Sequence, residues 1–367
     1  MALNFASEFS VYLPELNAQV IAFIRDPKAF RLNRYCQMVP TDKMVFEYWR
    51  LGVDNSVRAV SLTADAWPDG QRRPKGHHNK SKFDEVVSKT TRRNDSFDIG
   101  NLTAKQSVIK LLDIYSKEAQ SQHMTKRTAR LLNAAQTVAS WGANTATAAA
   151  LANVAGAFLD KGSSEETNPF FCVIKKTFDA VITKVMLLTN GMVDEVDTNV
   201  LKCVMSPNQA FKISETGEIH AYLKSSPDAA SQVRGRTAGL NKMYGLPDNL
   251  YGVDIEVENA MIVEQQPDAS DAIGSEAGIT GGAPKRHFIK NDSTMLFASR
   301  VGGLDGVPGA PSFSTLQIFH YGSEMEVETR DEAWDRLTEG GVVSNVFEAL
   351  TAPASGFCVT DVLSPPS

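Results

Sequence analysis

The sequence has few of the features that mark secreted, membrane-spanning or repeat proteins. It contains no apolar run of about 18 residues, no basic segment followed by an apolar one near its start, and no repeat with a period of tens of residues. We therefore expect a soluble protein without a signal peptide, and neither a solenoid nor a propeller. The few cysteines are far apart and form no Cys-x-x-Cys pair, so we expect reduced thiols in the core of an intracellular or virion protein: Cys36, Cys172, Cys203 and Cys358.

Recognisable catalytic and metal-binding motifs are also missing. The sequence contains neither Gly-x-Ser-x-Gly nor His-Glu-x-x-His. The adjacent His77 and His78 fall on an expected loop without a Cys, Asp or Glu at ligand spacing. Asp194 and Glu195 lie in a polar turn, where nothing suggests the burial that would shift a pKa. We predict no enzyme activity, no cofactor and no metal.

Two stretches resemble phosphate-binding loops but are incomplete. After a strand expected at 200–205, the turn Met-Ser-Pro-Asn has no glycine, and Pro207 removes one backbone donor. A glycine-rich loop from Gly278 to Arg286 lacks the Gly-Lys-Ser/Thr ending, and a strand-like segment follows it where a phosphate loop would have a helix. A soluble α/β nucleotide-binding enzyme that uses this loop is the alternative from a different class.

Composition indicates a folded chain with a large core. Hydrophobic residues make up 43% of its 367 residues, which is enough for two or three lobes. The net charge of −6 gives no overall attraction to nucleic acid, although local basic patches can still attract it.

The clearest local pattern is a helix, strand, helix unit at 170–213. Its first part has apolar residues at steps of three and four, which predicts one buried helical stripe: Ile174, Phe178, Val181, Ile182, Val185 and Leu188. A β-branched strand is expected at 200–205. Ser206 and Gln209 are spaced as a capping box, with Pro207 at the first position of a second helix.

Two segments have the composition of extensions. Residues 1–44 mix apolar side chains with a basic set and show little regular spacing, so they pack either on their own domain or on a neighbouring subunit: Arg25, Lys28, Arg31 and Arg34. Strands are expected at 44–49, 56–62 and 83–91. Between the last two, residues 67–82 form a long, exposed and basic hairpin tip, and such a two-stranded arm gains little stability by itself.

Other elements follow from spacing. One long helix or two in series should begin near the Thr103 capping box and end at Gly142, and a short helix is expected at 238–246. Residues 252–258 alternate apolar and acidic residues, which predicts a strand with a wet acidic row of Asp254, Glu256 and Glu258. Strands are expected at 295–299, 316–321, 325–329 and 357–363. A helix should start at Asp331 and run through 337, while 342–350 is open between helix and strand.

Read in order, these elements resemble the major capsid proteins of tailed phages, which have the Hong Kong 97-type fold. The hairpin residues Trp67, Asp69-Gly70 and Pro74, followed by 83–87 and 97–100, look like the E-loop of that family. Residues 325–331 and the last strand at 357–363 resemble its closing part. The departures are a longer and more basic hairpin tip and two glycine-rich loops.

The resemblance implies an α+β, Hong Kong 97-type capsid fold with five parts. These are an N-terminal arm (1–44), the E-loop and its flanking strands (45–100), a peripheral domain with a spine helix (101–168), an axial domain (169–350) and a return strand (351–367). The residues expected at subunit interfaces are Trp67, Arg72, Arg73, Lys75 and Phe83. The basic ones would meet an acidic surface next door, either the Asp254, Glu256 and Glu258 row or the region from Glu324 to Asp335.

The function implied is enclosure. Copies of the chain would assemble in the host cytoplasm into pentamers and hexamers of an icosahedral virion shell around double-stranded DNA, held without sequence specificity. Further partners would be a portal protein and scaffold or decoration proteins, with no membrane. An encapsulin-like shell that holds a protein cargo shares the fold and is the nearest alternative.

Overall fold

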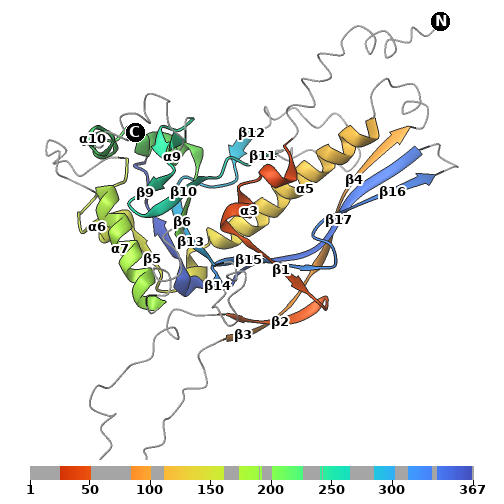
Figure 1. Cartoon of the computed structure of the whole chain (residues 1–367), viewed down its shortest axis with the longest axis horizontal. Coiled ribbons are helices and arrows are strands. Elements are labelled where there is room, and N and C mark those ends of the chain that lie inside the picture. Colours follow the sequence, from red (N-terminus) through yellow and green to blue (C-terminus); the bar gives the residue numbers. More distant parts are fainter. Residues whose placement is uncertain are drawn as a thin grey trace, which may run out of the picture.

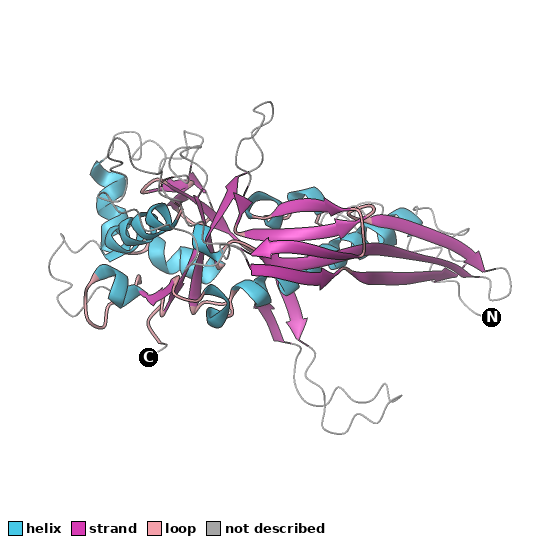
Figure 2. Ribbon diagram, turned by 90° about the horizontal axis from the view of Figure 1, so that it is seen from below, coloured by secondary structure: helices cyan, strands magenta, loops and turns pink. Residues whose placement is uncertain are grey.

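A computed structural model gives the fold. It describes residues 25–50, 84–100, 111–160, 173–189, 191, 201–225, 240–241, 243–264, 285–301, 313–332 and 337–365. Within them, two sheets lie side by side along the long axis of the molecule, as Figure 2 shows from below. Helices gather around one sheet, and a single long helix lies along the other (Figure 1).

The first sheet has seven strands in the order β5-β18-β13-β6-β10-β9, with β14 beside β13. Their bounds are β5 Thr145–Thr147, β18 Phe357–Thr360, β13 Thr294–Val301, β6 Leu201–Met205, β10 Val253–Val257, β9 Asn249–Leu250 and β14 Phe313–Ser314. Strand β6 is parallel to β10 and antiparallel to β13. The sheet therefore has mixed strand directions, and β6 lies in its interior.

This sheet separates two hydrophobic cores. Cys203 and Met205 of β6 face one core, whereas Val204 between them faces the other. Phe297 and Leu296 of β13 divide in the same way. Burial on both faces explains why these strands read as continuous apolar runs in the sequence.

The predicted helix, strand, helix unit is confirmed. Helix α7 (Val173–Leu188) buries four residues of the expected stripe in the first core: Ile174, Phe178, Val181 and Val185. Ile182 packs on that core partly buried, and Leu188 is half-buried. Strand β6 follows, and helix α9 (Pro207–Ser214) begins with the capping box, in which Ser206 and Gln209 each accept from the other's backbone N–H. Helix α10 (Gly217–Ser225) comes next, and α6 (Ala148–Ala152) packs near α7.

The second sheet is built around one long strand, β17 (Leu337–Leu350). Strand β4 (Thr91–Gly100) pairs with β17, as do β16 (Glu326–Glu332) and β15 (Leu316–Tyr321), and β15 also pairs with β1 (Gln37–Thr41). Helix α5 (Leu111–Ala135) lies on β4 and β17 (Figure 1). It continues through the polar stretch at 120–128 as one helix, and a 3-10 turn, η3 (Val138–Trp141), follows it.

Smaller elements complete the described chain. They are the turns η1 (Pro27–Ala29) and η4 (Pro353–Ser355), the short helix α3 (Leu32–Tyr35), and three two-stranded ribbons: β2 (Val45–Arg50) with β3 (Asp84–Lys89), β7 (Leu240–Asn241) with β8 (Leu246–Pro247), and β11 (Met261–Glu264) with β12 (Lys285–Phe288). The expected strand at 56–62 and the capping box at Thr103 lie outside the described residues.

Two helix predictions were wrong. Leu240–Asn241 and Leu246–Pro247 pair as the β7–β8 ribbon, and Gly245 has a φ of +71°, a conformation that breaks a helix. Asp331 and Glu332 end strand β16, and Leu337 begins β17 directly opposite Glu332. Pairing between strands outweighs helical spacing here, and it also decides that 342–350 is strand. The strands expected at 295–299, 316–321 and 325–329 are present, and the closing strand is shorter than predicted.

Candidate functional site

The five predicted interface residues, Trp67, Arg72, Arg73, Lys75 and Phe83, lie outside the described residues, so their role stays a prediction. The base of their hairpin is described. In the β2–β3 ribbon, Arg50 is opposite Asp84, so the chain leaves and returns at adjacent positions. This ribbon projects from the body of the molecule in Figures 1 and 2.

The ribbon is fixed to the body by one face only. Phe46 and Tyr48 pack on Phe319 of β15, with ring centroids 4.7 and 5.1 Å apart. On the opposite face, Val45 and Val87 are 54% and 63% exposed. Exposed charged side chains alternate with these two valines, so the open face is mixed and presents two large apolar groups that another chain would cover.

The root of the N-terminal segment is anchored on its own domain. Arg31 forms an ion pair with Glu256 at 3.3 Å, and the Tyr35 hydroxyl donates to Glu258 at 2.8 Å. Tyr35 is fully buried, and Leu32 beside it joins the second core. Of the two placements left open for residues 1–44, the described part from Arg25 onward therefore takes the one on its own body.

The prediction of a solvent-exposed acidic row on β10 is wrong. Glu256 and Glu258 are only 5% and 0% exposed, because the arm root covers that face of β10. Asp254 is half-buried and pairs with Lys202 at 3.2 Å. This row therefore cannot receive basic residues from a neighbour, since the chain's own arm occupies it.

Burial sets the protonation of this anchor. Desolvation raises the pKa of Glu258, and the hydrogen bonds from Tyr35 and from the Ala260 amide oppose the rise. Burial, together with the Glu258 carboxylate, raises the pKa of Tyr35 well above its usual value. The phenol therefore stays protonated and remains a hydrogen-bond donor to Glu258.

A polar relay that the sequence did not reveal connects α5 to the second sheet. His123 of α5 contacts Asp95 of β4 through Nδ1 and Ser344 of β17 through Nε2, both at 2.6 Å. Lys126 forms an ion pair with the second oxygen of Asp95. Burial lowers the pKa of His123; burial alone would raise that of Asp95, but the hydrogen bonds from Lys126 and His123 lower it overall.

The order Asp, His, Ser is that of a catalytic triad, yet these groups are enclosed. His123, Ser344 and Asp95 are 0%, 2% and 8% exposed, so no substrate can approach the Ser344 hydroxyl. The relay satisfies buried polar groups and holds the helix on the sheet. The only sequence signal is the polar stretch at 120–128 within the predicted helix.

Two arginines of α5 strengthen the same attachment. The Arg130 Nε pairs with Glu348 of β17 at 2.8 Å, and Arg127 donates to the Glu324 carbonyl oxygen at 2.6 Å. Arg127 is 1% exposed, and its Nε has no hydrogen-bond partner. One buried donor is therefore left unsatisfied beside a cavity that this residue lines.

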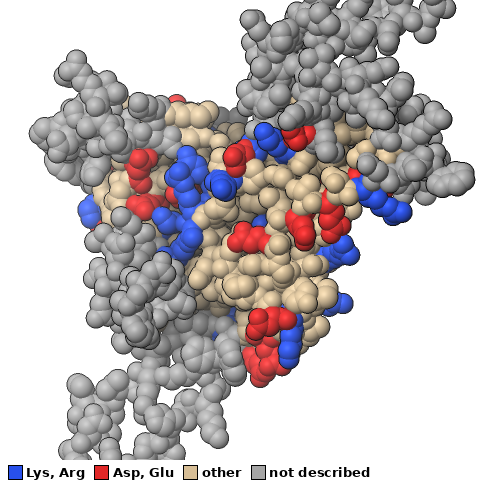
Figure 3. All heavy atoms as spheres, turned by 45° about the vertical axis from the view of Figure 1, so that its right-hand side comes forward, with Lys and Arg blue, Asp and Glu red and all other residues tan. Residues whose placement is uncertain are grey.

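The sheet face turned away from α5 is polar and hollowed. Its lining comes from alternate residues of β4, β16 and β17: Arg92, Asn94, Ser96, Asp98, Glu328, Arg330, Glu339 and Gly341, among others. Close packing requires glycine at two positions of β17. A Cβ on Gly341 would lie 2.7 Å from Asn94 Oδ1, and a Cβ on Gly340 would clash with the Phe97 ring. The face shown in Figure 3 carries acidic and basic groups in small clusters with uncharged areas between them.

The described residues carry neither of two further features. No helix there is long and apolar enough to span a membrane, and no group of three His, Cys, Asp or Glu is placed to hold a metal ion. The glycine-rich loop up to Pro284 lies outside the described residues, but the segment after it is strand β12, as expected. Because β12 is a strand, the segment after the loop offers no helix N-terminus to a phosphate.

Comparison with known proteins gives structural likeness without sequence likeness. No protein-family model matches the chain, and a search of curated proteins finds no match. A phage-related protein from Bordetella bronchiseptica RB50 is 11% identical, with 95% of this chain and 96% of that chain covered and a TM-score of 0.53. The capsid of an empty GTA particle is 10% identical, with 92% and 91% covered and a TM-score of 0.50. The mature capsid of bacteriophage PhiM1 is 11% identical, with 91% and 87% covered and a TM-score of 0.47.

At this level of identity the likeness establishes the fold alone. The chain has the mixed α+β, Hong Kong 97-type fold of tailed-phage capsid proteins, which confirms the fold class and the resemblance predicted from the sequence.

Proposed function

We propose that this chain is the major capsid protein of a tailed phage and that it forms pentamers and hexamers of an icosahedral shell around double-stranded DNA. The observation that carries the proposal is the extent of the fold match, which covers 92% of this chain and 91% of a capsid chain. Nearly all of the polypeptide is thus accounted for by a shell-forming architecture. The role is structural and not enzymatic, which agrees with the enclosed Ser344.

The proposed mechanism is mutual covering of surfaces between copies. The β2–β3 ribbon is anchored at its base by Phe46 and Tyr48 and leaves Val45 and Val87 open. A neighbouring copy would bury these two valines. Many such contacts of modest size, repeated by symmetry, close into a container that resists internal pressure.

The basic hairpin needs an acidic receiving surface on the neighbour. Of the two candidates, the row on β10 is excluded by its burial, whereas Glu324, Glu326 and Glu328 are exposed. We therefore assign the receiving role to the exposed acids of β16 and the turn before it. Arg72 and Arg73 would approach them from the next subunit.

A charge-swap experiment tests this contact. Arg72→Glu with Arg73→Glu should prevent shell formation, and adding Glu324→Lys with Glu326→Lys should restore it. The matched control is Lys43→Glu, which reverses an exposed charge elsewhere on the chain. Normal assembly of the Arg72 and Arg73 variant, judged by electron microscopy, would show that the contact is not needed.

Electron microscopy of the purified protein, followed by analysis of the particle contents, tests the function as a whole. Closed icosahedral shells with nuclease-protected double-stranded DNA from infected cells are expected. Shells filled with a protein cargo would favour the encapsulin-like alternative. A lone molecule that nucleotides stabilise would favour the enzyme that uses the loop from Gly278 to Arg286 and would overturn the proposal.

The remaining partners follow from the same role. Assembly in the host cytoplasm would involve a portal protein at one vertex and scaffold or decoration proteins, and the finished chain would reside in the virion. The packaged DNA would be contacted without sequence specificity through its phosphates.

A further inference from the structure

A cavity of about 650 Å³ lies at the arm root, between three elements that are distant in sequence. We call it the arm-root cavity; it is lined by Arg25, Asp26, Pro27, Lys28 and Asn33 of the arm, Met38 of β1, Lys117, Gln120, Met124 and Arg127 of α5, and Ser323, Glu324 and Met325 before β16. Its size is that of a small-molecule or side-chain binding site.

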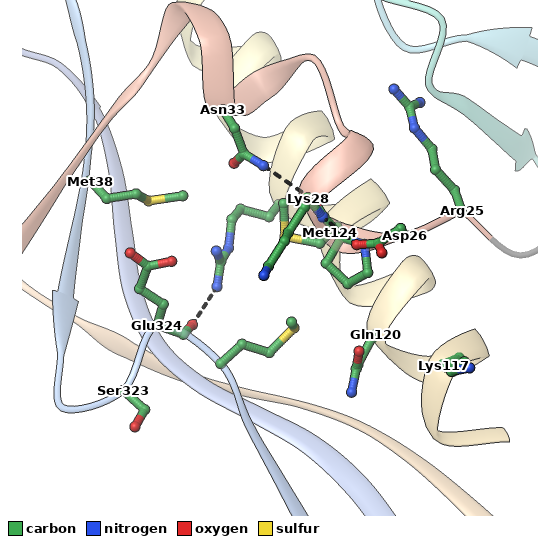
Figure 4. Close-up of a pocket in the computed structure, with 13 residues that line it drawn as sticks. Arg25, Asp26, Lys28, Asn33, Met38, Lys117, Gln120, Met124, Ser323 and Glu324 are labelled. Carbon is green, nitrogen blue, oxygen red and sulfur yellow. Dashed lines mark hydrogen bonds between the residues drawn. The ribbon is translucent and has the colours of Figure 1, made fainter. Parts of the chain in front are cut away.

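The cavity contains cationic groups that the described residues leave unpaired. Arg127 is buried with a free Nε, and the ammonium groups of Lys28 and Lys117 have no hydrogen-bond or ion-pair partner among the described residues. Figure 4 shows Lys28 extending from the arm into the cavity, while Arg25 turns away from it. Arg25 is engaged elsewhere, with Asn259 at 2.8 Å.

Carboxylates near the cavity balance these cations only in part: burial lowers the pKa of Arg127, Glu348 and Glu324 oppose that lowering, and neither carboxylate forms an ion pair with Arg127. One oxygen of Asp26 accepts from the Lys28 backbone N–H at 2.8 Å, which caps the η1 turn. Glu324 is exposed and forms no ion pair with a described residue, although its carbonyl oxygen accepts from Arg127. A buried, incompletely paired guanidinium is costly, so a site of this kind gains from an external anion.

The remaining lining is apolar and adaptable. Met38, Met124 and Met325 line the cavity, and in Figure 4 Met38 enters it from the side opposite Lys28. Methionine side chains adjust to apolar groups of different shape. A bare inorganic ion would leave these side chains without a partner.

We propose that the arm-root cavity binds a carboxylate carried on an apolar body, with Arg127 and Lys28 holding the carboxylate, Lys117 adding charge at the cavity, and the methionines receiving the apolar part. A free organic acid and an acidic side chain of another polypeptide share this chemistry. Because the arm, α5 and the turn before β16 all line the site, the ligand would bind the arm root to the long helix. The inference does not depend on the shell function.

The test uses saturation-transfer NMR on the purified full-length chain with 4-phenylbutyrate as the probe. Binding is expected, and acetate should bind at least about tenfold more weakly because it lacks the apolar body. Lys28→Gln with Lys117→Gln should weaken binding about tenfold, roughly threefold for each exposed lysine. Lys43→Gln, an exposed lysine outside the cavity, should leave it unchanged.

Two further variants separate binding from folding. Glu324→Gln should strengthen binding about threefold, because it removes a competing carboxylate from the cavity. Arg127→Lys keeps the charge and loses the planar fork, so it should weaken binding while thermal melts report its folding separately. If that variant does not fold, the exposed lysine variants still decide the question.

Competition identifies the source of the carboxylate. Displacement of the probe by an acetylated, amidated Leu-Glu-Leu peptide would indicate a protein segment, and failure of the peptide would indicate a free organic acid; both support the site. Equal binding of inorganic phosphate and 4-phenylbutyrate, or binding that the lysine variants do not alter, would overturn the proposal.

Discussion

Replacing Glu258 by glutamine or by alanine separates the two contributions of the buried anchor. The carboxylate is fully buried and accepts hydrogen bonds from the Tyr35 hydroxyl at 2.8 Å and from the Ala260 amide at 3.0 Å. Alanine removes both acceptors and the charge. Glutamine removes the charge and one of the two acceptors: its oxygen can accept from the Ala260 amide and its amide group can donate to the Tyr35 oxygen, but the Tyr35 O–H then lacks its acceptor.

The two substitutions should differ by about 2 kcal/mol in their effect on the free energy of unfolding. An unsatisfied buried donor costs about 1–3 kcal/mol, so Glu258→Ala should lose about 3 kcal/mol after the relief of the buried charge is included. That corresponds to a fall of roughly 5 °C in Tm. Glu258→Gln should cost less, about 1 kcal/mol, because only the Tyr35 O–H loses its acceptor and the buried charge is relieved.

The pH dependence provides a second measure. Burial raises the pKa of Glu258 above its usual 4.5, so between 4.5 and the raised value the folded chain binds more protons than the unfolded chain. The stability of the natural chain should therefore fall as pH rises through this window, and Glu258→Gln should lack that part of the fall. Calorimetry with all variants in the same assembly state measures both effects. A glutamine variant as unstable as the alanine variant would refute the reasoning, since it would mean that the charge itself is required.

Three other outcomes are expected. Gly356→Ala should cost about 3 kcal/mol in thermal melts, because its Cβ would lie 2.5 Å from a backbone oxygen, whereas Gly217→Ala, with open space around it, should cost little. His123→Gln should flatten the acid limb of stability: burial lowers the His123 pKa below its usual 6.5, so the natural chain loses stability as pH falls through the lowered value, which melts between pH 7.5 and 5 will detect. Burial raises the pKa of the Cys36, Cys203 and Cys358 thiols, that of Cys358 to about 11. These thiols should resist Ellman's reagent in the native protein and react with it after unfolding.

Elements specified by neighbouring residues could be predicted from the sequence. The capping box of Ser206 and Gln209 involves groups three positions apart, so its spacing alone indicates the start of α9. The stripe of α7 is equally local. The predictions that the cysteines are free and buried hold for the three that the structure describes.

Elements specified by distant residues were misread or missed. Glu258 is buried by Tyr35, which lies 223 positions away, so the alternation on β10 could not reveal that both of its faces are covered. The relay of Asp95, His123 and Ser344 joins three separate elements and has no spacing motif. The sequence at 331–337 has helical spacing, but its described residues Asp331, Glu332 and Leu337 are strand, since Asp331 pairs with Thr338.

The burial of the acids on β10 also bears on which charges could direct contacts between copies of the chain. The basic set of the arm root and the acids of β10 are complementary in charge, and the structure pairs them within one chain, as in Arg31 with Glu256. Charges paired internally are not free to direct association between copies. The exposed acids Glu324 and Glu326 form no ion pair with a described residue. Variants of the anchor should therefore change the stability of the subunit, and variants of the hairpin or of β16 should change assembly, so the two sets of experiments can be interpreted independently.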